Sequence, residues 1–163
     1  MTYPNQDALS RAKCSLAAEV VRQHGQLRLR VTGLSMLPAV WPGDIVTVER
    51  QEPAHVQSGE LVLVEHEGRL RLHRLVARQR FRETVCLVTR GDSLSADDPP
   101  VLPAQVLGVV TSIQRRGKAL SPQRSPAKLA WLFSNSYLGA WTARVALHWR
   151  ALLARKETLR IVS

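Results

Sequence analysis

Six short segments rich in valine, leucine and isoleucine succeed one another between residues 27 and 114. Glycine, proline and aspartate separate them, and the backbone preferences of these residues favour turns. The segments cover residues 27–31, 44–48, 60–66, 70–78, 84–89 and 106–114. The pair Glu67-Gly68 fits a hairpin turn between the third and the fourth segment. Many short strands without a long helix predict a mainly β core, a curled sheet or partial barrel.

The segments that flank this β region have a different pattern. Within residues 6–24, Leu9, Leu16 and Val20 are among the apolar residues at helical spacing, and the pattern ends near Gly25. Apolar residues at helical spacing return near the C-terminus. We therefore predict four units, which are an N-terminal helix in 1–26, a β domain in 27–114, a polar linker in 115–127 and a helical tail in 128–163.

Positive charge is concentrated in the last third of the chain. Residues 1–110 carry 13 Lys and Arg against 12 Asp and Glu, whereas residues 111–163 carry 10 against one. In the tail, Trp131, Trp141 and Trp149 accompany this charge. A basic amphipathic helix over residues 128–156 would suit an anionic membrane surface, and one that packs on the β core is an equal alternative. Contact with nucleic acid would be nonspecific.

No segment of the sequence predicts export or membrane insertion. The first residues lack a basic stretch followed by an apolar one, and the longest uncharged run outside the loops, residues 129–143, is shorter than a membrane span. We expect a cytoplasmic protein, with peripheral attachment to the inner face of the membrane through its tail. Cys14 and Cys86 form no disulfide framework and are expected to be reduced. We expect no metal and no cofactor.

The stretch RVTGLSMLPAVWPGDIVTVER, residues 30–50, interrupts two strand-like segments with an apolar loop that holds Ser35. A serine hydroxyl becomes a good nucleophile only when a base takes its proton. No lysine lies on a core segment, so a Ser-Lys pair is unsupported. His73 lies within RLRLHRLVAR, where a structural histidine would be the commoner explanation. Acids follow the next strand at Asp92, Asp97 and Asp98, where turn formation is the simpler interpretation.

Taken together, GLSMLPAVWPGDIVTVE, GELVLVE, LHRLV and TRGDSLSADDPPVLPAQVLGVV, in this order, resemble the signal peptidase and LexA-like serine peptidase superfamily. The nearest likeness is to the endoplasmic-reticulum and archaeal branch, which has His-Arg where bacterial signal peptidases have Lys-Arg. The resemblance covers roughly residues 27–113 and implies a coiled, mostly antiparallel sheet.

The resemblance also implies roles for individual residues. Ser35 would be the nucleophile, His73 the general base and Asp98 the third catalytic acid, with Asp92 a second required carboxylate. The Ser35 backbone N–H would contribute to the oxyanion hole. Met36 would shape the substrate pocket next to Pro38. The implied activity is a serine endopeptidase that cleaves a specific peptide or precursor after small residues.

Two other functions are compatible with the sequence. An inactive member of the same fold would bind peptides, although such a module has no need of the serine, the histidine and both acidic boxes. A LexA-like regulator would bind DNA and cleave itself, which requires a DNA-reading domain. Only about 26 residues precede the predicted β core, too few for that domain, a linker and a cleavage site. The sequence predicts neither the substrate nor the oligomeric state.

Overall fold

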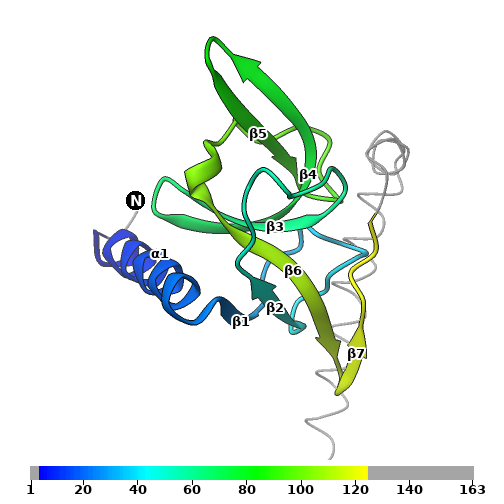
Figure 1. Cartoon of the computed structure of the whole chain (residues 1–163). Coiled ribbons are helices and arrows are strands. Elements are labelled where there is room, and N and C mark those ends of the chain that lie inside the picture. The colour runs from blue at the N-terminus through cyan, green and yellow to red at the C-terminus, as the bar shows by residue number, and fades with distance from the viewer. Residues whose placement is uncertain (1–3, 125–163) are drawn as a thin grey trace, which may run out of the picture.

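The computed structural model describes residues 4–124, which form one helix followed by a seven-stranded sheet (Figure 1). The elements in chain order are α1 (Pro4–His24), β1 (Gln26–Arg30), β2 (Ile45–Glu49), β3 (Leu61–His66), β4 (Arg69–Phe81), β5 (Thr84–Arg90), the short 3₁₀ helix η1 (Pro103–Gln105), β6 (Val106–Arg115) and β7 (Lys118–Leu120). Each of the six predicted strands is present. The mainly β fold with an N-terminal helix is therefore confirmed.

All strand pairs in the sheet are antiparallel. The order is β1-β2-β6-β3-β4-β5, and β7 pairs with β6. Glu67 and Gly68 form the predicted turn between β3 and β4, both with positive φ, which is the backbone of a tight two-residue hairpin. The long strand β4 changes partner midway, because residues 69–74 pair with β3 and residues 74–81 pair with β5.

Strand β3 lies at the centre of the core and is buried on both faces. Leu61 and Leu63 belong to one apolar cluster, which also contains Met36 and Val46. The alternate residues of β3 belong to a second cluster with Leu75, Leu87, Val101 and others. Successive side chains of a strand point to opposite faces, so a sheet that coils around β3 can bury both sets. This explains the uninterrupted apolar run LVLV in the sequence.

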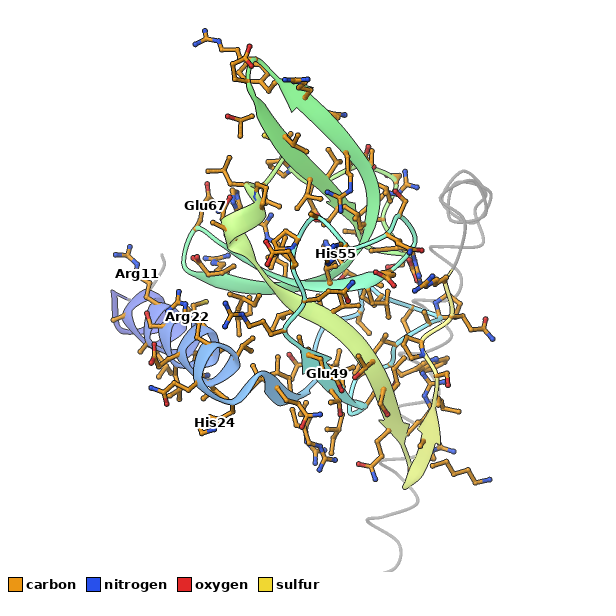
Figure 2. The ribbon with its side chains drawn as sticks, in the orientation of Figure 1. Arg11, Arg22, His24, Glu49, His55 and Glu67 are labelled. Carbon is orange, nitrogen blue, oxygen red and sulfur yellow. The ribbon has the colours of Figure 1, made fainter. Side chains whose placement is uncertain are left out.

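Helix α1 packs beside β1 and the β3–β4 turn through a narrow face of small side chains. Its buried residues are Cys14, Ala17, Ala18 and Val21, whereas Leu9 and Leu16, two of the apolar residues at helical spacing, are exposed. Arg11 reaches the turn that carries Glu67 (Figure 2), and its side chain lies against Gly68. Burial, together with the negative charge of Glu65, raises the pKa of the Cys14 thiol. Both cysteines are free, as predicted.

The region after β6 differs from the predicted linker. Residues 116 and 117 make a tight turn with positive φ, and Lys118–Leu120 return along β6 as β7. An exposed edge strand of only three residues carries little sequence signal, which is why this strand was not predicted. The predicted helical tail, residues 128–163, and its proposed membrane contact through residues 128–156 lie outside the described residues. Within residues 4–124, no helix is long and apolar enough to span a membrane.

Candidate active site

Ser35 lies in the loop between β1 and β2, and buried apolar neighbours hold it in place. The two strand ends are joined by a hydrogen bond from the Val31 N–H to the Asp44 carbonyl oxygen, 2.8 Å long. Between them the chain makes a helical turn in which the Val40 N–H donates to the Met36 carbonyl oxygen. Met36 and Val40 are both buried in the first core cluster. The buried residues of the loop therefore hold Ser35 in a defined position.

His73 faces Ser35 from strand β4. It is the last residue of β4 before the strand also begins to pair with β5. Its Nε2 lies 2.9 Å from the Ser35 Oγ. Its Nδ1 lies 2.5 Å from Oδ2 of Asp98, which is in the loop that follows β5. The side chains of His73 and Asp98 are only 8% and 13% exposed, so little water competes for these contacts. Three of the four residues predicted to be catalytic thus form one hydrogen-bonded chain.

Asp98 determines which atom is the donor in each of these two hydrogen bonds. An ionised carboxylate can only accept hydrogen bonds, so the proton between the two residues belongs to the His73 Nδ1. The His73 Nε2 is then unprotonated and accepts the hydrogen bond from the Ser35 hydroxyl. This is the arrangement in which histidine can take the proton of a serine nucleophile.

Thr89 fixes the position of Asp98, a role that the sequence reasoning did not assign. The Thr89 hydroxyl donates to the Asp98 Oδ2 at 2.7 Å, and the Asp98 N–H donates to the Thr89 carbonyl oxygen at 2.8 Å. The loop after β5 is also tied to the serine loop, because the Ser93 N–H donates to the Ser35 carbonyl oxygen at 2.9 Å. Thr89 and Ser93 both lie in the TRGDS stretch, which the sequence identified as a family motif without indicating a role for either hydroxyl group.

Asp92 does not join the serine and the histidine. Its two carboxylate oxygens accept hydrogen bonds from the Arg74 guanidinium at 2.7 and 2.6 Å. Arg74 is buried next to His73 and also donates to the carbonyl oxygens of Gly59 and Gln123. Asp97 pairs with Arg90 at 3.2 Å. Asp92 therefore fixes Arg74, which joins neighbouring backbone segments, and within residues 4–124 no hydrogen bond or ion pair links Asp92 to Ser35 or His73.

A cleft of about 480 Å³ opens beside Ser35 and His73. Apolar residues from four strands line it together with Met36, the residue predicted to shape the substrate pocket. Pro38 was predicted to share this role, but it is exposed and is not among the lining residues. Its carbonyl oxygen accepts a hydrogen bond from the Trp41 indole N–H instead. The difference arises because the turn after Met36 directs the chain away from the cleft.

The cleft runs along two strand edges that lack a neighbouring strand in the described part of the chain. One edge belongs to β1, whose partner is β2, and it contributes Leu29 and Arg30 to the lining. The other is the first half of β4, which pairs with β3 on one side and contributes residues 70–73. Unpaired N–H and C=O groups on such edges can accept an added strand.

The site has the geometry of a serine peptidase of the Ser-His-Asp type. The sequence matches the Peptidase S24-like family over residues 2–110, a stretch that includes α1, the three residues of the hydrogen-bonded chain and most of the sheet. The chain belongs to this family, in which the fold is that of the LexA-like and signal peptidase-like serine peptidases. A comparison with curated proteins finds no match. Within residues 4–124 there is no group of three or more His, Cys, Asp or Glu placed to hold a metal ion.

Proposed function

We propose that the protein is a serine endopeptidase that uses Ser35 as the nucleophile, His73 as the general base and Asp98 as the orienting acid. The observation that carries this proposal is the continuous hydrogen-bonded chain from the Ser35 Oγ through both nitrogens of His73 to the Asp98 carboxylate. A protein that only binds peptides would have no use for a histidine held in this tautomer. Ser35 and His73 also line the cleft, where a substrate could reach the Ser35 hydroxyl.

The reaction follows from the positions of the three groups. The Ser35 Oγ attacks the scissile carbonyl carbon while its proton passes to the His73 Nε2. The charge on the resulting imidazolium is stabilised by Asp98, 2.5 Å away. His73 then gives the proton to the departing amine as the C–N bond breaks, which leaves an acyl-serine. Water, deprotonated by the same nitrogen, hydrolyses this ester and restores the serine.

The negative charge that develops on the carbonyl oxygen needs a hydrogen-bond donor. Within residues 4–124, no hydrogen bond occupies the Ser35 backbone N–H, and Ser35 lines the cleft. We assign it to the oxyanion hole. Gly33, two residues before the nucleophile, also lines the cleft but has no hydroxyl to offer as a second donor. A single protein donor would make this a slower enzyme than peptidases with two donors.

The substrate is proposed to bind as an extended segment between the edges of β1 and β4. Main-chain hydrogen bonds to these edges would supply affinity, and side chains would enter the apolar floor of the cleft. Within this superfamily a histidine base is typical of the endoplasmic-reticulum and archaeal signal peptidases, which supports a likeness of this protein to that branch. We propose this finer assignment on the His73-Arg74 pair and on Asp92, Asp97 and Asp98, the three acidic residues that follow β5.

The test is hydrolysis of a complex peptide mixture, such as a tryptic digest of a whole proteome, by the purified full-length chain. Wild-type protein is expected to generate new peptide termini, which mass spectrometry identifies together with the residues around each cut. The Ser35→Ala variant should generate none above background. If wild type and variant give the same peptides, the protein is not a peptidase, and retention of intact peptides on Ser35→Ala would then support a peptide-binding function.

A further inference from the structure

The cleft beside Ser35 carries basic side chains on three different elements. Lys13 of α1, Arg30 of β1 and Arg71 of β4 are all among its lining residues. Across residues 4–124, the lining contains no aspartate or glutamate. The rest of the lining is neutral, mainly apolar residues with a histidine at the catalytic end. The cleft is therefore an apolar channel with a positively charged rim.

These three cations are not used to hold the fold together. Other arginines near the site have clear structural partners, such as Arg74 with Asp92 and Arg115 with Asp44. By contrast, no ion pair or side-chain hydrogen bond among the described residues engages Lys13, Arg30 or Arg71. Their charges remain available to a ligand. Like charges gathered around one groove without a partner repel each other, and an anionic ligand would relieve this repulsion.

The arrangement of the cations fixes where an anionic group would bind relative to the reaction. Arg71 precedes His73 by two residues in the regular β3–β4 pairing, so the two share a face of β4 and lie about 7 Å apart along the strand. Arg30 ends β1, five positions before Ser35. Lys13 comes from α1, which packs at the start of β4 near Gly68. The lining residues from β1 precede Ser35 and those from β4 precede or end at His73, which indicates that the cleft and its three cations extend to one side of the Ser35–His73 pair.

We infer that the peptidase selects substrates that carry a glutamate or aspartate on one side of the scissile bond, within about two to five residues of it. This inference rests on the proposed function and names its substrate class. The apolar floor accepts the side chains next to the cleaved bond, and the cationic rim accepts the acidic one. Charge pairs at a partly exposed rim are typically weak singly, so we expect a preference of about 3–10-fold in kcat/KM over a neutral peptide.

A library of twin peptides provides the test. Each peptide has a central Ala-Ala. One member of a pair has Glu at one of the five positions on either side of this centre, and its twin has Gln at the same position. The purified full-length chain should cleave the Glu members faster at positions on one side only. Raising the ionic strength from about 0.05 M to about 0.5 M should reduce the preference, because exposed charges are then screened.

Variants separate the cleft from the overall charge of the protein. Arg71→Gln and Arg30→Gln should each lower the Glu-to-Gln rate ratio, and Arg71→Glu should bring it to one or below. Arg80→Gln is the matched control, because Arg80 lies on the same strand, is 72% exposed and is not a lining residue of the cleft. It should retain the wild-type ratio. Equal rates for Glu and Gln twins at every position, with cleavage intact, would overturn the inference and leave the proposed function standing.

A wild-type protein that cleaves no peptide would instead refute the proposed function, and binding then decides the inference. Fluorescence anisotropy of the same labelled peptides with the full-length Ser35→Ala variant measures binding without turnover. Tighter binding of Glu peptides, lost in Ser35→Ala combined with Arg71→Gln, would support an acid-selective cleft. Equal binding of the twins, or no binding of either, would overturn it.

Discussion

Gly91 lies directly against the Ser35 main chain. A Cβ added at this position would come within 2.6 Å of the Ser35 carbonyl oxygen and 2.9 Å of the Ser35 Cβ. Gly91, the first residue after β5, therefore allows the loop that carries Asp92, Asp97 and Asp98 to approach Ser35. The same contact brings the Ser93 N–H to the Ser35 carbonyl oxygen.

Gly91→Ala should displace the serine loop from His73. We expect loss of most peptidase activity together with a destabilisation of about 1–3 kcal/mol, because both clashes are with atoms that cannot rotate away. Urea unfolding followed by tryptophan fluorescence measures the stability, and peptide cleavage measures the activity. Gly33→Ala is a suitable control for stability, since a Cβ there has open space around it. Wild-type activity in Gly91→Ala would contradict the proposed contact.

Thr89 is expected to act on catalysis through Asp98. Removal of its hydroxyl in Thr89→Val leaves the shape nearly unchanged but takes away one of the hydrogen bonds that orient the carboxylate. We expect kcat to fall about 10-fold with little change in KM, whereas Asp98→Asn should cost about 10⁴-fold by favouring the wrong histidine tautomer. Thr89→Ser, which keeps the hydroxyl, should recover most of the rate. Steady-state kinetics on one peptide substrate gives all three values.

Asp92 is predicted to matter for stability through its pair with Arg74. The Arg74 side chain is 2% exposed, so Asp92→Asn leaves a buried guanidinium without its counter-charge. The expected cost is about 3–5 kcal/mol in the free energy of unfolding. The measurement is chemical denaturation of Asp92→Asn beside Asp97→Asn, whose acid is half exposed and should cost less than about 1 kcal/mol. Equal stability of the two variants would argue against a structural role for Asp92.

The pH dependence of cleavage distinguishes a histidine base from a lysine base. His73 can accept the serine proton only when its Nε2 is unprotonated, so the rate should fall at acidic pH, where that nitrogen is protonated and cannot act as a base. A lysine base would require alkaline conditions. Initial rates from pH 5 to pH 9 on a single peptide provide the profile. A flat profile would remove His73 from this role, provided that circular dichroism shows the fold intact at each pH.

The strand pattern could be predicted from the sequence because it depends on local rules, whereas the serine, histidine and acid segments were brought together by the resemblance of their ordered motifs to a known superfamily. Alternating or continuous apolar runs and the Glu67-Gly68 turn define the sheet without reference to the rest of the chain. The order of the motifs then indicates which loops meet. The place of Met36 at the pocket was implied by the family resemblance and not by local pattern.

The details that could not be predicted depend on the paths of loops through space. Asp92, Asp97 and Asp98 all follow the same strand. The family resemblance assigned Asp98 to the catalytic set, but the pairing of Asp92 with Arg74 is seen only in the folded structure. The exposure of Pro38 has the same origin. The cationic rim was not predicted either, because Lys13, Arg30 and Arg71 are far apart in sequence and meet only when α1 packs beside the sheet.

The most direct test of the central claim is a comparison of protein N-termini in lysates of cells that contain wild type, Ser35→Ala or His73→Ala. The account predicts new termini with wild type that are missing with both variants, and the sequences at these termini would give the substrate and its cleavage site. Western blotting confirms equal amounts of the three proteins. Identical sets of termini in all three lysates would contradict the claim that the Ser35–His73–Asp98 chain is a peptidase site.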